Sequence, residues 1–519
     1  MHITPEGMIS VALMITTLAI AATSILGIWG LTRGAPIMLL GILAVPMVFM
    51  MSLNVPKFSK SSRAGAFDNE LPFVMGFMVV LAGGGVSPLG TLRRIADINL
   101  FPAAVKEAKR ILVDIEIFGM DPITALERAA KYVPNKFFSE FLYGYTTILK
   151  TGGSIVSYLN TKLGEVFELR AAKMRGASAT TGTLAEGYIA VTALLGITLF
   201  TLFQVQALIS GGGGGGLESI SLFSFIVVPM LSVMFIWILD NVSPKQPYVD
   251  MVPYKILAAF LPVGVAIYFI PLRIPGYLHI SIALIAMMVV PTIVAMRHSR
   301  ERRGLEKMLP EFIQDIAESR KIGLPPEKSI ELLASKNYRR LSKHVQKMGV
   351  QLSWGVTLNR VIKTFSSSAR SWLTKVVGTL IAEGVDVGGG TMSSFVNMAN
   401  FTRKINDMES ERSSSMKPFL FIIYMSGLMV ILTTFLMTYF LNQPMTTGYS
   451  PVATSSKAQA GAMVDQLLVA SIFETWVIGF VAGKMGEGVV SDGFKHSLVL
   501  VVMSVACVYV ARFFIPIPI

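Results

Sequence analysis

Residues 309–334 read LPEFIQDIAESRKIGLPPEKSIELLA, and residues 71–96 read LPFVMGFMVVLAGGGVSPLGTLRRIA. The two stretches share one pattern, because Gly85 matches Gly323 and Pro88 matches Pro326. Glycine just past a helix end adopts the left-handed cap easily, and proline fits the first turn of the next helix. Each stretch therefore predicts a helix, a glycine stop, a proline start and a second helix.

Two further breaks recur in the same order. Gly119-Met120-Asp121-Pro122 matches Gly355-Val356-Thr357-Leu358, and Gly152-Gly153-Ser154 matches Gly389-Gly390-Thr391. Asp121 and Thr357 are predicted N-caps, as are the hydroxyl residues that follow the paired glycines. Because all three breaks recur with offsets of 236 to 238 residues, the sequence indicates an internal duplication of a helical unit.

The composition indicates a polytopic membrane protein. Of the 519 residues, 53% are hydrophobic and 15% are charged, and the mean hydropathy is +0.61. Apolar runs of about 18 residues or more predict membrane-spanning helices. We predict nine of them: Met8–Trp29, Ala35–Leu53, Glu186–Leu208, Ser219–Leu239, Tyr254–Pro271, Leu278–Met296, Pro418–Leu441, Val464–Ala482 and Leu498–Ile515.

The positive charge predicts the orientation. The net charge is +13, and residues 54–185 and 297–417 hold most of the Lys and Arg residues. Basic segments stay on the cytoplasmic side, so both are expected in the cytosol, with the N-terminus inside and the C-terminus outside. A nucleic-acid surface is the alternative, but interleaved acidic residues favour ordinary solvated helix faces.

We expect an all-α membrane protein in which two similar cytosolic helical bundles are inserted between groups of spans. The predicted order is two spans in residues 1–53, the first bundle in 54–184, four spans in 185–296, the second bundle in 297–417 and three spans in 418–519. Breaks divide the first bundle into six helices: Asp68–Ala82, Pro88–Ile98, Pro102–Phe118, Pro122–Tyr132, Lys136–Lys150 and Ile155 to about Ser178. Its first helix is so apolar that it is expected to be buried or to lie on the membrane.

No catalytic, metal or cofactor motif is found in the sequence. The five histidines are scattered, and the single cysteine, Cys507, lies in an apolar run. Gly211–Gly216 lacks the Gly-Lys-Ser/Thr of a phosphate loop and is interpreted as a flexible outer linker. Gly479 to Met485 resembles a phosphate loop but is one residue short and lacks the metal-binding hydroxyl. We therefore predict no enzyme activity, no cofactor and no metal.

Two features of the eighth span are open to more than one interpretation. Glu474 is a carboxylate in the middle of the span, where it is either a helix-packing group or part of a transport pathway. The small-residue pair Gly479 and Gly483 allows a helix to approach closely, either within this chain or from a partner.

The duplicated unit, with each copy leading into a span, resembles the type II secretion F domain. That domain defines the inner-membrane platform proteins of type IV pili, type II secretion and the archaellum. The chain is most similar to archaeal type IV filament platforms, the FlaJ or ArlJ family of archaellum assembly proteins, on the strength of its long tail. The signature positions carrying the resemblance are Gly85, Pro88, Gly323, Pro326, Glu474, Gly479, Gly483, Lys484, Gly493, Lys495 and His496.

The resemblance implies a protein without catalytic activity that docks a cytosolic hexameric ATPase of the FlaI or ArlI type. It implies that ATPase motion reaches filament subunits, archaellin or pilin, through the spans, with a regulatory membrane-associated ATP-binding protein as a further partner. Another archaeal pilus or a secretion-like system is the alternative; a homodimer is expected, and nucleic acid is not. The docking candidates are charges near the helix breaks: Arg93, Arg94, Glu127, Arg128, Arg320, Lys321, Glu327, Lys328, Arg339, Arg340 and Lys343.

Overall fold

The computed structural model describes residues 65, 67–98, 100–133 and 135–195, positions 198, 201, 202 and 205, and then 221–242, 250–271, 273–386, 391–442 and 457–514. The first two predicted spans, the six-glycine linker and the Gly389-Gly390 pair lie outside these residues. Most of the third predicted span beyond residue 195 does so too.

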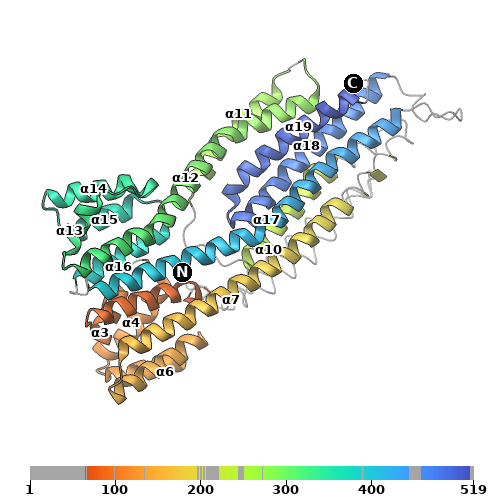
Figure 1. The fold of residues 1–519 in the computed structure, drawn as a ribbon. Helices are drawn as coiled ribbons and strands as arrows, with labels where there is room; N and C mark the ends of the chain where they lie inside the picture. The colour runs from red at the N-terminus through yellow and green to blue at the C-terminus, as the bar shows by residue number, and fades with distance from the viewer. Residues whose placement is uncertain are drawn as a thin grey trace. The chain divides into compact units, whose positions relative to one another are not determined.

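The described residues are helical and contain no strand, which confirms the predicted all-α class (Figure 1). A helix through residues 67–83 precedes the labelled elements. They are α3 (Pro88–Asp97), α4 (Pro102–Glu116), α5 (Pro122–Tyr132), α6 (Lys136–Thr151), α7 (Ile155–Ile189), η2 (Ala190–Leu195), η3 (Phe223–Val227), α10 (Val228–Val242), α11 (Val252–Phe269), α12 (Gly276–Lys321), α13 (Pro326–Leu333), η4 (Arg339–Leu341), α14 (Ser342–Ser353), α15 (Leu358–Ser368), α16 (Trp372–Asp386), α17 (Met392–Asn442), α18 (Lys457–Glu487), η5 (Val490–Asp492) and α19 (Gly493–Phe514).

The chain divides into two compact units. Unit 1 holds the described residues up to Met75 and Ser87–Lys162, and unit 2 holds Gly76–Val86 and Leu163 onward. The core of unit 1 is aromatic: the Phe138 and Phe141 ring centroids lie 5.5 Å apart, and those of Phe141 and Tyr145 lie 5.7 Å apart. Such rings bury large apolar areas, so they hold α6 in the bundle.

A buried carboxylate completes the start of α4 in unit 1. Phe101 precedes α4 and has no side chain that can cap it. Glu70 supplies the cap instead, accepting the N–H groups of Ala103 at 3.2 Å and Ala104 at 2.9 Å. Burial raises the pKa of Glu70, although these two hydrogen bonds oppose the rise. The cap therefore ties the first helix of the unit to α4.

Unit 2 contains the second bundle and the membrane helices. The end of α12, the helices α13 to α16 and the start of α17 pack around nearly inaccessible apolar side chains, among them Phe312, Ile316, Val345, Val361 and Val377. Six helices are long and apolar enough to cross a membrane, counted over the described residues. They coincide with the fourth to ninth predicted spans: Phe223–Val242, Val252–Phe269, Gly276–Lys321, Met392–Leu436, Val464–Glu487 and Val490–Ala511.

The repeated breaks have the same backbone form in both copies. Gly85 and Gly323 have φ of 81° and 89°, and Gly119 and Gly355 have φ of 66° and 78°, all in the left-handed region. Pro88 and Pro326 each start a helix as predicted. The duplication is therefore visible in the backbone as well as in the sequence.

Three of the four predicted N-caps make the expected hydrogen bond. Asp121 accepts the N–H groups of Ile123 and Thr124, while Ser154 and Thr391 accept those of Ser157 and Ser394. Thr357 occupies the N-cap position of α15, but its side chain makes no capping hydrogen bond.

The apolar first helix of copy one is buried, which resolves the two alternatives raised by its sequence. All residues from Phe73 to Leu81 except Gly76 are exposed by 5% or less, and Gly76 is buried as well. In unit 2, a Cβ on Gly76 would lie 2.9 Å from the ring of Phe401, and one on Gly384 would lie 3.1 Å from Val80. These close contacts pack residues 76–83 against α16 and α17.

Three unbroken helices lead from the bundles toward the spans. Helix α7 has 35 residues and continues directly into η2, and α17 has 51 residues. Helix α12 was not predicted to be continuous, yet its 46 residues join the sixth span to the second bundle without a break. Both Pro291 and Pro310 lie inside it, so these prolines do not end the helix here.

Alanine at a glycine break and alanine inside a helix are predicted to have opposite effects on stability. Gly323→Ala forces a side chain into the left-handed region and should lower stability by ~1–2 kcal/mol. Gly176→Ala is the matched control, because Gly176 lies inside α7 with no atom near its Cβ position, and alanine there should raise stability by ~0.5–1 kcal/mol. Thermal unfolding of the purified chain in detergent should move the midpoint down for the first variant and up for the second; shifts in the same direction would contradict the assigned caps.

Candidate functional site

The tail residues that carry the family resemblance lie around one tight helical hairpin. Helix α18 ends at Glu487, Gly488 takes a φ of 79°, and the short η5 leads into α19 at Gly493. Glycine permits this left-handed turn without a Cβ clash. The turn brings the ends of α18 and α19 together.

Glycines bring the two helix backbones of the hairpin into contact. A Cβ on Gly479 would lie 2.3 Å from the backbone of Ser497, and one on Gly483 would lie 2.0 Å from the Cα of Gly493. Neither backbone could remain in place if a side chain were added. The Gly479 and Gly483 pair therefore packs within this chain, which settles the question left open by the sequence.

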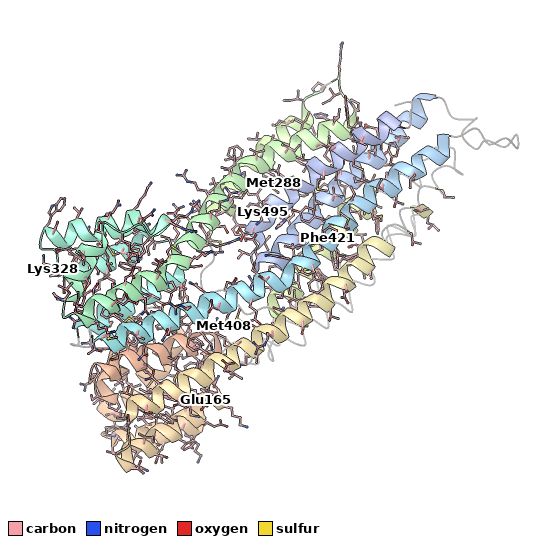
Figure 2. The ribbon with its side chains drawn as sticks, viewed as in Figure 1. Glu165, Met288, Lys328, Met408, Phe421 and Lys495 are labelled. Atoms are coloured by element: carbon pink, nitrogen blue, oxygen red, sulfur yellow. The ribbon has the colours of Figure 1, made fainter. Side chains whose placement is uncertain are left out.

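A cluster of charged residues closes the same end of the hairpin. The carboxylate of Glu487 accepts hydrogen bonds from Arg303 on α12 and from Lys495 on α19. Arg412 on α17 donates to the Glu487 carbonyl oxygen at 3.2 Å, and Asp492 lies 3.9 Å from Arg303. We call these five residues the Glu487 cluster; it joins α12, α17, α18 and α19, and Figure 2 shows Lys495 at this end of the hairpin.

Two more contacts extend the site to neighbouring helices. Lys484 Nζ lies 2.5 Å from Asp240 Oδ1 on α10, and His496 Nδ1 lies 2.7 Å from the Tyr424 hydroxyl on α17. Lys484 and His496 are both buried. Signature positions scattered over the tail sequence thus meet in one place, at the end of the hairpin.

Burial decides which of these ion pairs is costly to break. The side chains of Glu487 and Asp492 are only 13% and 7% exposed, although their partner Arg303 is 53% exposed; in the Glu168–Lys404 pair between α7 and α17 both side chains are exposed, by 67% and 49%. Exposed pairs contribute little, but removing one partner of a buried pair leaves an uncompensated charge. Glu487 is therefore the residue on which the cluster depends.

Glu474 is buried in the same helix, farther from the charged cluster. Its exposed fraction is 2%. Hydroxyl pairs flank it along α18: Ser471 with Thr434 at 2.7 Å, and Thr475 with Ser504 at 3.0 Å. These pairs bond α18 to α17 and α19 at the level of Glu474.

The docking candidates of copy one are largely engaged in pairs within unit 1. Arg93 contacts Glu116 at 2.7 Å, Glu127 contacts Lys150 at 2.5 Å, and Arg128 lies 3.7 Å from Asp114. Arg94 is partly buried. These side chains connect neighbouring helices of the bundle as well as facing solvent.

The candidates of copy two fall into two groups. Arg320 donates to the Leu324 carbonyl at 2.7 Å, Lys328 pairs with Glu331 at 2.6 Å, Lys321 is exposed and Glu327 is half-buried. The other three, Arg339, Arg340 and Lys343, are exposed in η4 and at the start of α14, and we call them the basic turn.

The basic turn has an unusual backbone conformation, which side-chain hydrogen bonds hold in place. Arg339 has a φ of 53° and is the one non-glycine residue with positive φ among the described residues. Asn337 Oδ1 accepts the Arg339 N–H at 2.9 Å, and Ser342 Oγ accepts the Tyr338 N–H at 2.7 Å. Asp315 on α12 accepts a hydrogen bond from the Tyr338 hydroxyl at 2.5 Å.

A left-handed arginine is unfavourable, so other contacts must maintain it. Sparsely populated backbone states cost ~1–3 kcal/mol and are concentrated at functional sites. The stem of Arg340 also covers Gly304 of α12 so closely that a Cβ there would lie 2.2 Å from Arg340 Cδ. The turn is therefore a fixed part of the bundle rather than a loose surface segment.

Sequence reasoning did not identify Arg303, Arg412 and Asp492, which complete the Glu487 cluster. Arg303 and Arg412 lie in charge-rich stretches where no spacing distinguishes them from solvated residues. No group of three or more His, Cys, Asp or Glu side chains suited to a metal occurs in the described part of the chain.

Comparison with known proteins agrees with the duplicated fold. The family model for type II secretion system protein F matches the chain twice, at residues 75–203 and 312–438. Two copies in one chain are the architecture of type IV filament platform proteins.

Two relatives come from the archaeon Methanocaldococcus jannaschii. Uncharacterized protein MJ1286 is 21% identical over 496 residues, covering 88% of this chain and 82% of the relative. Uncharacterized protein MJ0780 is 23% identical over 202 residues, covering 38% of this chain and 57% of the relative. No solved structure matches the chain. Because the family model matches both helical bundles and the helices that leave them, this chain belongs to the type II secretion system protein F family and carries two copies of its domain.

Proposed function

We propose that this chain is the membrane platform of an archaeal type IV filament machine, most similar to that of the archaellum. A type II secretion or type IV pilus-like inner-membrane platform is what the two F domains support. The archaellum assignment rests on the tail signature and on the likeness to an archaeal protein along nearly the whole chain. A platform of another archaeal pilus is the alternative.

The observation that carries the proposal is the continuity of α12 and α17. Helix α12 and helix α17 each run through a span and into the second bundle as one helix. A helix of 46 residues is about 70 Å long at 1.5 Å per residue, and it transmits displacement that a flexible linker would absorb. The two helices therefore act as levers between the bundle and the membrane.

The Glu487 cluster couples these levers to the last two spans. Arg303 belongs to α12 and Arg412 to α17, and both bond to Glu487 at the end of α18. When α12 or α17 shifts, this buried pairing and the glycine contacts make the α18–α19 hairpin move with it. Glu474, about three and a half helical turns into the hairpin from Glu487, serves helix packing in this scheme rather than transport.

The energy comes from a cytosolic ATPase of the FlaI or ArlI type that docks on the bundles. Basic segments stay inside, so the N-terminus and both bundles face the cytosol and the C-terminus lies outside. The basic turn, Arg339, Arg340 and Lys343, is the leading contact for acidic groups of the ATPase, because the fold holds it in one conformation. Filament subunits, a regulatory membrane-associated ATP-binding protein and a second copy of this chain complete the assembly, and the chain has no catalytic activity of its own.

Glu487→Gln should break the coupling without preventing ATPase binding. The amide cannot neutralise Arg303 and Lys495, so the buried carboxylate that holds these two cations together would be lost. In cells lacking the native chain, this variant should restore ATPase recruitment but not swimming or filaments. The matched control is Glu168→Gln, whose exposed pair with Lys404 contributes little.

Three outcomes of that complementation test are informative. Full motility with Glu487→Gln would contradict the coupling role. Loss of a different surface filament in the deletion strain, with swimming intact, would assign the platform to an adhesion pilus. Unchanged filaments and motility in the deletion strain would contradict the platform function itself.

Arg339→Gly should separate stability from docking. Glycine accepts a φ of 53° without strain, so the unfolding midpoint should rise, while ATPase affinity should fall several-fold because the charge is lost. The control is Arg360→Ala, which removes an exposed charge from α15 of the same bundle. Thermal unfolding of the purified variants measures stability, and binding of the purified ATPase to the chain in nanodiscs measures affinity. An affinity that is the same for Arg339→Gly and the native chain would exclude the basic turn as the docking contact.

A further inference from the structure

His298 lies in α12 just after the sixth predicted span and contacts a charged residue from each of two other elements. Its Nδ1 lies 2.6 Å from Asp250 Oδ2, and its Nε2 contacts a guanidinium nitrogen of Arg370. The side chains of His298 and Asp250 are only 13% and 21% exposed. We call these three residues the His298 bridge.

The bridge joins three elements of unit 2. Asp250 precedes α11 and caps it, because its Oδ1 accepts the Val252 N–H at 3.0 Å. His298 lies near the middle of α12, and Arg370 lies in the turn between α15 and α16. The bridge therefore connects the start of α11, the middle of α12 and the second bundle.

The turn before α16 has a second contact with α12, about two helical turns beyond His298. Ser371 is fully buried, and its Oγ donates to Glu306 Oε1 at 2.7 Å and accepts the Thr374 N–H at 3.1 Å. Arg370 and Ser371 thus hold the first turn of α16 on α12 through two adjacent contacts.

The chemistry of the guanidinium fixes where the proton of His298 lies. Arginine has only N–H donors and keeps its charge, so Nε2 of His298 must accept the hydrogen of Arg370. The ring is therefore neutral in this state, with its proton on Nδ1, where it donates to the Asp250 carboxylate. A second proton would occupy Nε2, which is the atom that Arg370 contacts.

The other charged groups near this part of α12 interact with one another or with solvent. The exposed ones are Arg297 and Arg300 on α12 and Lys255 on α11. The interacting ones are Glu301 with His344 of α14, Arg302 with Glu306 and with Asp492 of η5, Arg303 with Glu487 of α18, Lys495 of α19 with Glu487, and Glu409 with Arg412 of α17. His298 is thus the titratable group that Asp250 and Arg370 share.

We propose that the His298 bridge is a pH-sensitive joint, which holds the turn before α16 fully on α12 only while His298 is neutral. Histidine is the side chain whose charge ordinarily changes between about pH 5 and 8. At the upper end of this range Nε2 accepts Arg370, and both contacts of the turn are made. At the lower end the imidazolium keeps its bond to Asp250 but repels Arg370, so the turn stays attached through Ser371 alone.

The inference goes beyond the proposed function, because it concerns one chain and requires no partner. Arg370 is exposed, so solvent protons can reach Nε2 when the guanidinium moves away. In a platform, release of Arg370 would loosen α16 from α12 and weaken transmission through α12 when the pH around the bundle falls.

The test measures hydrogen–deuterium exchange in the first turn of α16, using the full chain in nanodiscs at about pH 7.5 and about pH 5.5. In the native chain, protection of the Thr374 and Lys375 amides, corrected for intrinsic exchange, should fall about tenfold on acidification. That is the size expected for the loss of one charge-assisted hydrogen bond.

Three variants assign the effect to the bridge. His298→Gln stays uncharged at both pH values and should show no fall in protection. Arg370→Ala lacks the contact and should show low protection at both. The matched control is His344→Gln, which removes the other histidine of the second bundle and should keep the full fall.

The native chain alone can overturn the proposal, whether or not the variants fold. Equal protection at both pH values would show that the joint does not open. A fall that persists in His298→Gln, or that disappears in His344→Gln, would assign the pH response to another group. Native protection of Arg370→Ala at the higher pH would show that Arg370 does not hold the turn. Each of these results overturns the inference and leaves the proposed function untouched.

Discussion

The helical continuity of α12 and α17 is the constraint on which the rest of the structure depends. In the proposed function, motion received by the helical bundles must reach the helices that cross the membrane. Only a stiff element that belongs to both regions can do this, and helices provide it because each turn is fixed to the next. Pro291, Pro310 and Pro418 lie within these helices without ending them.

Stiff helices alone would not move the α18–α19 hairpin unless they were joined to it. The Glu487 cluster provides that joint through cations that meet at a buried carboxylate, and Gly479, Gly483 and Gly493 provide it through direct backbone contact. Buried ion pairs contribute little net stability but strongly oppose separation of their partners. Such a joint suits a coupling element, because it resists relative movement at one point while the outer faces of the helices remain free.

Much of the fold could be predicted from the sequence because its signals are local. Glycine and proline breaks at Gly85, Pro88, Gly323 and Pro326 report backbone conformations that depend on a few neighbouring residues. Apolar runs likewise located the six spans that the described residues contain. The continuity of α12 was missed because prolines and a charge-rich stretch ordinarily suggest a break between a span and a bundle.

The candidate site was predictable only in part, because its partners are far apart in the sequence. Lys484, Lys495 and His496 were singled out by a family pattern, but Arg303 meets Glu487 across 184 positions and no local signal announces it. The positive φ of Arg339 could not be predicted from the sequence either, because arginine rarely adopts the left-handed conformation. Both depend on tertiary contacts that the sequence does not display.

The stiffness of α17 between bundle and span is the most direct test of the account. Residues Ser413, Ser414 and Ser415 lie in that region, and replacing all three with glycine should make the helix flexible, whereas replacing them with alanine should keep it stiff. The account predicts that both variants bind the ATPase, that the alanine variant assembles filaments, and that the glycine variant does not. Normal filament assembly by the glycine variant would contradict force transmission through this helix.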